Sequence, residues 1–123
     1  MKHQLNNIDI HIATGGRKFD PYGEVVIMLH GSGQNHLTWV LQSRYFAYRG
    51  FAVLAPDFPG HGLSGGSPLE SIEAMAAWVI ELMDSLDVKK AMLVGHSQGC
   101  LVTIETAARY PKRVKRVALI AGA

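Results

Sequence analysis

Four short apolar runs, each the length of one β-strand, constrain the fold of this 123-residue chain more than any other feature. Continuous runs of this length, rich in Val, Leu, Ile and Ala, predict strands that are buried on both faces, as in a parallel sheet. Helix-length segments separate the runs. The alternation predicts an α/β fold, a mostly parallel sheet with flanking helices, in a single domain over 1–123. The four predicted strands cover 24–30, 51–55, 91–94 and 114–121.

The segments between these runs carry helix signals. The middle helix is expected to open with Ser67 as its cap, Pro68 in its first turn and Glu70 completing a capping box. Apolar residues then recur at helical spacing over 72–86. Residues 4–13 alternate weakly and predict one or two edge strands. The other two predicted helices are 37–48, which ends at Gly50, and 98–110, which ends at Pro111.

Two glycine-rich motifs directly follow predicted strands. The sequence HGSG occupies 30–33 after the first strand, and GHSQG occupies 95–99 after the third. In a parallel sheet, ligands bind beyond the carboxyl ends of the strands. We therefore expect the functional site at this edge of the sheet. A third motif, DFPGHGLS at 57–64, follows the second strand. Its Asp57 is interpreted as an aspartate that stabilises the turn, with a polar group facing a substrate as the alternative.

The pentapeptide at 95–99 fits the pattern G-x-S-x-G between a strand and a helix. A sharp turn there would hold Ser97 in a strained conformation and expose its hydroxyl at a helix N-terminus, where free N–H groups favour negative charge. Gly95 and Gly99 fit because side chains at these positions would collide with the neighbouring strand and helix. The alternative is that Ser97 only caps the helix.

The order of these motifs, followed by Tyr110-Pro111 and the last apolar run, resembles the α/β-hydrolase superfamily. The resemblance extends over nearly the whole chain and matches the first half of the family's fold. It implies that Ser97 is the nucleophile of a serine hydrolase that acts on an ester, thioester or related acyl bond of a small molecule.

The resemblance also implies an oxyanion hole. Its first backbone N–H donor would come from Ser32, with Gly33 as second choice, and its second from Gln98. The residues around these donors would support the loop at 30–33 and the sharp turn at 95–99, which is called the nucleophile elbow. These supporting residues are His30, Gly31, Gly33, Gly95, His96 and Gly99. The alternative for 30–33 is an ordinary glycine-rich turn.

The catalytic triad of this family runs in the order Ser, Asp or Glu, His. After Ser97, the only acidic residue is Glu105, within a predicted helix, and there is no histidine. We therefore expect a truncated or incomplete hydrolase domain that is inactive alone, since serine needs a base. His30 or His61 as a substitute base is the less favoured interpretation. A catalytically dead binding module that keeps the fold is the alternative function.

The remaining features define the expected partners. The net charge of +2 argues against nucleic-acid binding. No cluster of Cys and His has metal-ligand spacing, so neither a metal nor a cofactor is expected. No signal peptide or long apolar segment is present, which predicts a cytoplasmic protein without a membrane partner. The apolar strand at 114–121 has no later strand to cover it, which predicts self-association or pairing with a complementing chain.

Overall fold

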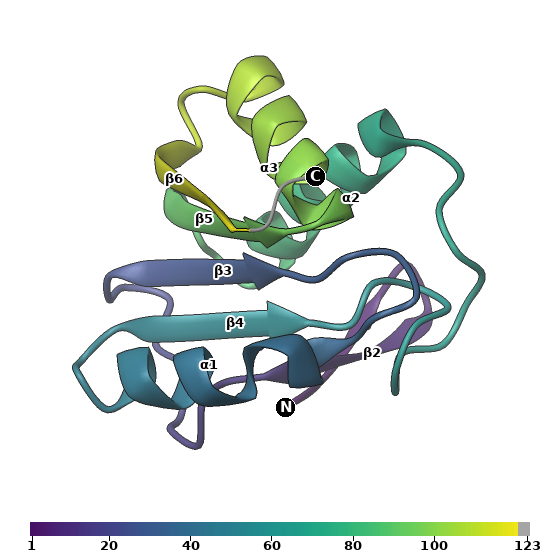
Figure 1. The fold of residues 1–123 in the computed structure, drawn as a ribbon. Helices are drawn as coiled ribbons and strands as arrows, with labels where there is room; N and C mark the ends of the chain where they lie inside the picture. Colours follow the sequence, from purple (N-terminus) through teal and green to yellow (C-terminus); the bar gives the residue numbers. More distant parts are fainter. Residues whose placement is uncertain (121–123) are drawn as a thin grey trace.

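The structure, a computed structural model, describes residues 1–120 and contains one mixed six-stranded sheet. The strand order is β1-β2-β4-β3-β5-β6 (Figure 1). Strands β4, β3, β5 and β6 run parallel, whereas β1 and β2 pair antiparallel with each other and β2 pairs antiparallel with β4. The strands are β1 (Lys2–Leu5), β2 (Ile8–Ala13), β3 (Val25–Leu29), β4 (Ala52–Pro56), β5 (Ala91–His96) and β6 (Val114–Ile120). The predicted α/β fold is confirmed.

Helices cover both faces of the sheet. The short 3-10 turn η1 (His36–Trp39) leads into α1 (Val40–Ala47), which lies on one face, and α2 (Ile72–Ser85) and α3 (Gln98–Arg109) lie on the other (Figure 1). Strand β3 shows why: Ile27 packs in the apolar cluster with α2 and α3, whereas Val26 and Met28 pack in the cluster with η1 and α1. A strand in this position must be apolar on both faces, as the sequence pattern predicts.

The first helix and several strand ends differ from their predicted limits. The helix predicted at 37–48 is α only over Val40–Ala47, because a 3-10 turn capped by Asn35 precedes it. Strand β5 continues to His96, two residues beyond its predicted end. Strand β4 includes Pro56 as its last residue, where the proline pairs with Ile12. The predicted strand end at Ala121 lies outside the described residues.

The start of α2 was predicted wrongly. The helix begins at Ile72, and its N-cap is Ser71, whose hydroxyl accepts a hydrogen bond of 3.0 Å from the backbone N–H of Ala74. Ser67, Pro68 and Glu70 remain in the preceding loop. Pro68 packs directly against Gly60 there, so this contact within the long loop overrides the local helix-start pattern.

The amino-terminal segment forms a hairpin. Asn6 and Asn7 form its two-residue turn, with φ of 53° and 62°, and asparagine tolerates this region better than most residues. Of the two strands, only β1 lies at the edge of the sheet; β2 is interior because it also pairs with β4. At the opposite edge of the described sheet, β6 exposes Val117, Leu119 and Ile120 by 45–47%.

The sheet register positions the glycine-rich motifs next to each other. Strands β3 and β5 are neighbours, with Leu29 opposite Gly95 at their carboxyl ends. The loop after β3 and the turn after β5 therefore meet at one point.

Within residues 1–120, none of the helices has both the length and the apolar character needed to cross a membrane.

Candidate active site

Ser97 occupies the sharp turn between β5 and α3. Strand β5 ends at His96, α3 begins at Gln98, and Ser97 between them has φ 55° and ψ −122°. Residues with a side chain rarely adopt this conformation, which costs of order 1–3 kcal/mol. The Ser97 side chain makes no capping hydrogen bond to α3, so the interpretation of Ser97 as a simple helix cap is not supported.

The two glycines of the pentapeptide permit close backbone contacts. A Cβ atom on Gly95 would clash with the carbonyl oxygen of Gly99, and a Cβ atom on Gly99 would clash with the carbonyl oxygen of Leu29. The first turn of α3 therefore lies directly against the end of β3. These contacts are the collisions that the sequence pattern predicts for this turn.

The loop formed by residues 30–34, which we call loop 30–34, lies against Ser97. A Cβ atom on Gly31 would be 2.9 Å from Cβ of Ser97. The N–H of Gly31 is already used, because it donates to Oε1 of Gln34. Within residues 1–120, the backbone N–H groups of Ser32 and Gln98 donate no hydrogen bond. They are the two donors predicted for the oxyanion hole; the N–H of Gly33, the second choice, is also free in this part of the chain.

Gln34 joins loop 30–34 to the turn that holds Ser97. Its Oε1 accepts from the N–H of Gly31 at 2.8 Å, and Nδ1 of His96 lies 3.1 Å from the same oxygen. Because this oxygen is only an acceptor, Nδ1 of His96 carries the proton. Sequence analysis did not identify Gln34, since nothing local distinguishes it from any other polar loop residue.

His30 is a buried support of the loop. Its Nδ1 lies 2.7 Å from the carbonyl oxygen of Gly31, and its Nε2 accepts from the N–H of Phe58 at 3.1 Å. One nitrogen must therefore donate and the other accept, which fixes the neutral Nδ1–H form. Burial lowers the pKa of His30 and favours the same neutral form.

The substitute bases considered from the sequence make no hydrogen bond with the nucleophile candidate. Both nitrogens of His30 are occupied, and Nδ1 of His61 lies 3.1 Å from the carbonyl oxygen of Pro59. In the part of the chain that the structure describes, no histidine ring is hydrogen-bonded to the hydroxyl of Ser97.

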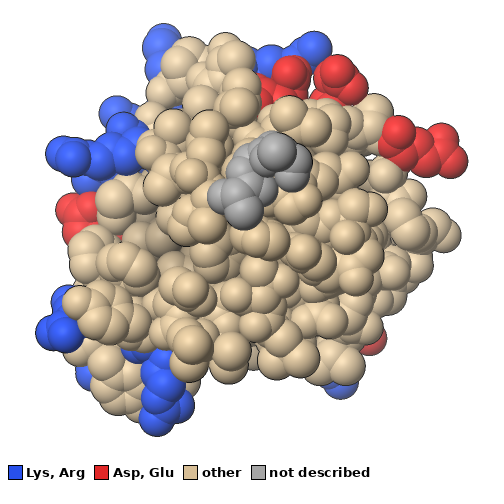
Figure 2. Space-filling view, viewed as in Figure 1, with Lys and Arg blue, Asp and Glu red and all other residues tan. Residues whose placement is uncertain are grey.

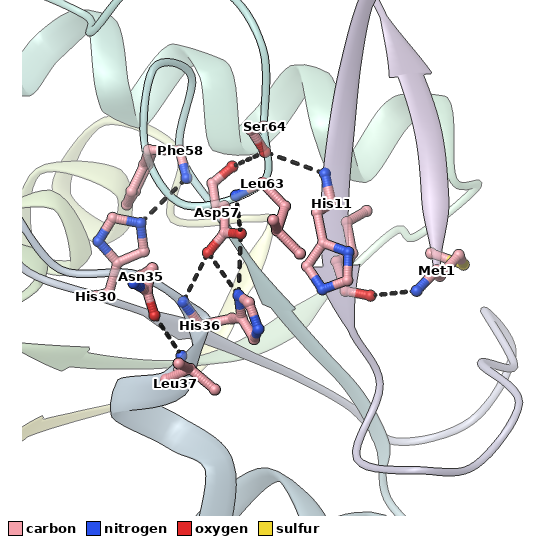
Figure 3. Close-up of polar contacts among 11 residues, drawn as sticks. Met1, His11, His30, Asn35, His36, Leu37, Asp57, Phe58, Leu63 and Ser64 are labelled. Atoms are coloured by element: carbon pink, nitrogen blue, oxygen red, sulfur yellow. Dashed lines mark hydrogen bonds and ion pairs between the residues drawn. The ribbon is translucent and has the colours of Figure 1, made fainter.

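A second polar cluster surrounds Asp57, which immediately follows β4 (Figure 3). The Asp57 carboxylate is fully buried and accepts from the backbone N–H groups of His36 at 2.6 Å and Leu63 at 2.9 Å. Nδ1 of His36 lies 2.9 Å from both carboxylate oxygens. These contacts support the interpretation of Asp57 as a turn-stabilising residue over a group that faces a substrate.

His11 on β2 lies beside this cluster, with its ring centroid 4.5 Å from that of His36. Burial, and then the nearby His36, lower the pKa of His11. His11 and His36 are 25 residues apart in the printed sequence, and no sequence spacing indicated that they would meet.

Comparisons with known proteins agree with this architecture. The model of the alpha/beta hydrolase fold family matches residues 24–123. The 2-hydroxy-6-oxo-6-phenylhexa-2,4-dienoate hydrolase of Burkholderia cepacia is 35% identical over 121 residues, which are 94% of this chain and 41% of that protein. The (E)-2-((N-methylformamido)methylene)succinate hydrolase of Acinetobacter baylyi is 33% identical over 101 residues, or 81% of this chain and 38% of that protein.

Solved structures show the same similarity. The enol-lactonase from Burkholderia xenovorans LB400 superposes with a TM-score of 0.81 at 28% identity, over 95% of this chain and 45% of that one. A membrane phospholipase A superposes with a TM-score of 0.88 at 26% identity, over 100% of this chain and 39% of that one. The chain thus spans less than half the length of these relatives. The elbow, the sheet order and the family match together establish that the chain belongs to the α/β-hydrolase fold family.

Proposed function

We propose that this chain is the nucleophile-bearing part of a serine hydrolase that cleaves an ester, thioester or related acyl bond of a small molecule. The observation that carries the proposal is the strained turn at Ser97, which lies against loop 30–34, together with the backbone N–H groups of Ser32 and Gln98, which donate no hydrogen bond within residues 1–120. Strain at a residue with a reactive side chain is typical of functional sites. Relatives that are hydrolases by name support the same reaction class.

In the proposed reaction, the oxygen of Ser97 attacks the acyl carbon while a base takes its proton. The carbonyl oxygen becomes an oxyanion, which the N–H groups of Ser32 and Gln98 stabilise without reorganisation. Collapse expels the alcohol or thiol, which receives the proton, and leaves an acyl-serine. Water then attacks the acyl-serine, the acid product leaves and the serine regains its proton.

We propose that the base and its acidic partner lie in polypeptide outside these 123 residues. Serine is a weak nucleophile without a base, and residues 1–120 contain no hydrogen bond between a histidine and the hydroxyl of Ser97. The apolar edge at β6, where Val117, Leu119 and Ile120 are exposed, is the proposed contact for that polypeptide. On this proposal, the 123-residue chain alone has little activity.

The net charge of +2 and the face shown in Figure 2 favour a small-molecule substrate over a nucleic acid. On the face shown in Figure 2, Lys and Arg side chains lie around the rim, and a broad area in the middle carries neither sign of charge. Nucleic-acid sites need a continuous basic surface.

The test uses a chimera in which this chain replaces the matching region of the Burkholderia cepacia hydrolase. The chimera is incubated with a fluorophosphonate, and its intact mass and modified peptide are measured. We expect one adduct on Ser97, lost in Ser97→Ala and retained in Ser67→Ala, which removes an exposed loop serine. A chimera that is folded by circular dichroism but forms no Ser97-dependent adduct contradicts the proposal.

The lack of a hydrogen bond between a histidine and the Ser97 hydroxyl in residues 1–120 favours one second candidate, a binding module without catalysis. That function predicts no adduct in the folded chimera, together with ligand binding that Ser97→Ala leaves unchanged. The same mass measurement therefore distinguishes the two functions.

A further inference from the structure

We propose that His11, His36 and Asp57 form a binding site for a divalent transition-metal ion such as Zn²⁺. One nitrogen of each imidazole and one carboxylate oxygen all lie within 4.8 Å of one another. Figure 3 shows the three side chains converging from three different segments of the chain. The proposal is independent of the function of Ser97 and differs from the expectation, drawn from sequence spacing, that the chain binds no metal.

The donor set selects the type of metal. Two imidazole nitrogens and one carboxylate oxygen are a ligand combination that Zn²⁺, Co²⁺ and Ni²⁺ accept, whereas Ca²⁺ and Mg²⁺ require oxygen ligands. The set leaves at least one coordination position for water or another ligand.

The backbone holds the three residues close together before any ion binds. His11 lies on β2 and Asp57 directly follows β4, and the N–H of Asp57 donates to the carbonyl oxygen of His11 at 2.9 Å. His36 begins η1, where its own N–H donates to the Asp57 carboxylate. Ligands on strands and capped turns are placed more precisely than ligands on free loops.

The charge of the site favours a cation. The Asp57 carboxylate is fully buried, and Gly62 packs so closely against it that a Cβ atom there would clash with the carboxylate. Among residues 1–120, no Lys or Arg pairs with this carboxylate; the side chain beside it is the imidazole of His36, which is charged only when protonated. A buried carboxylate is costly unless it is paired, and a divalent ion would supply the missing positive charge.

The site also has access to solvent. His11 and His36 line a cavity of about 400 Å³, whose wall includes Thr14 and Ser43.

The spacing of the ligand atoms is close to that of a metal site. Around a zinc ion with bonds of about 2.0–2.1 Å, ligand atoms lie roughly 3.4 Å apart. The 2.9 Å separation between Nδ1 of His36 and the carboxylate is slightly shorter than this, and all the ligand atoms lie within 4.8 Å of one another. Small side-chain rotations close the site as the metal replaces the proton between His36 and Asp57.

The experiment titrates the chelator-treated chain with Co²⁺, followed by visible absorption, and with Zn²⁺, followed by calorimetry. We expect one ion per chain and a higher thermal unfolding temperature with Zn²⁺. The decisive variant is His11→Ala, because the His11 side chain makes no hydrogen bond within residues 1–120 and its loss leaves the Asp57 contacts in place. Affinity should fall by about tenfold or more in this variant and in His36→Ala.

The matched control is His3→Ala, which removes a histidine on β1 that contacts Ser85 instead of the cluster. This variant should bind the metal as the unmodified chain does. The proposal is overturned if the chain binds no stoichiometric ion, or if a folded His11→Ala variant retains the affinity and the thermal shift. Equal losses in His11→Ala and His3→Ala also overturn it, since they indicate adventitious binding to surface histidines.

Discussion

The turn around Ser97 and the cluster around Asp57 are both built at the carboxyl ends of parallel strands, yet they differ in how they use hydrogen bonds. Both oxygens of the Asp57 carboxylate accept from backbone N–H groups. In loop 30–34 and in the turn at Ser97, the N–H groups of Ser32 and Gln98 donate none within residues 1–120. Satisfied buried groups stabilise a fold, whereas free, fixed donors are the arrangement that stabilises charge formed during a reaction.

The two sites also differ in the conformation and packing of their backbone. Ser97 adopts a conformation that destabilises the folded state, and glycines on either side permit it. The close approach of Gly62 in the Asp57 cluster instead encloses a carboxylate that holds two loops together. We propose that the Asp57 cluster stabilises the fold and that the turn at Ser97 serves the reaction, and substitutions can test each role.

The largest effect is expected for Gly99→Ala. The added Cβ would clash with the carbonyl oxygen of Leu29, so β3 or α3 must move. We expect a loss of about 3 kcal/mol or more in the free energy of unfolding, measured by urea denaturation. Gly65→Ala is the control, since its nearest contact would be an ordinary 3.6 Å. Equal effects of the two substitutions would refute the close contact.

The second largest loss of stability is expected for Asp57→Ala, which removes the acceptor of the N–H groups of His36 and Leu63. Groups left without a partner inside a protein are costly, and we expect about 2–3 kcal/mol of destabilisation. The same urea measurement applies, with Asp57→Asn as a comparison that keeps one acceptor oxygen. Unchanged stability in Asp57→Ala would show that the cluster does not contribute to stability.

Acid should weaken loop 30–34 through His30, whose folded-state pKa is lowered by burial. The unfolded chain binds the proton near the ordinary pKa of about 6.5, and the folded chain binds it only at lower pH. The contribution to stability is therefore complete above that pH and declines as the pH falls below it. His30→Asn should flatten this slope in urea unfolding from about pH 7.5 to 5.5. Part of the slope should remain, because the pKa of His11 is lowered too; an unchanged slope would contradict the role of His30.

The smallest effect, and one of opposite sign, is expected for Ser97→Gly. Glycine adopts φ 55° without steric cost, so stability should rise by about 1 kcal/mol. Ser97→Ala keeps the Cβ atom and should leave stability nearly unchanged. Thermal and urea unfolding of the pair isolate the backbone strain from the hydroxyl. A glycine variant that is less stable than the alanine variant would show that the turn is unstrained.

The parts of the fold that were predicted correctly depend on local patterns. Strand β3 is buried on both faces, so every residue of it is apolar and the strand is visible in the sequence. The turn at Ser97 was predicted because its glycines and its flanking strand and helix are contiguous. The start of α2 was not predicted correctly, because the packing of Pro68 against Gly60 competes with the local helix-start pattern.

The parts of the site that were not predicted depend on distant contacts. Gln34 contacts His96, which is 62 positions away, and His36 contacts Asp57 across 21 positions. Only the order of β4, β3 and β5 in the sheet brings these segments together. A glutamine or histidine in a loop carries no local mark of such a partner, so the pairings become visible only in three dimensions.

The fixed protonation of His30 gives the molecule an internal spectroscopic probe. The Nδ1–H group of His30 is buried and donates to the carbonyl oxygen of Gly31, so its proton exchanges with solvent only when loop 30–34 opens. Its proton resonance therefore reports the opening rate of the segment that carries Ser32, without any label. The imidazole that holds loop 30–34 in place thus also makes the opening of this loop measurable, through the exchange of a single proton.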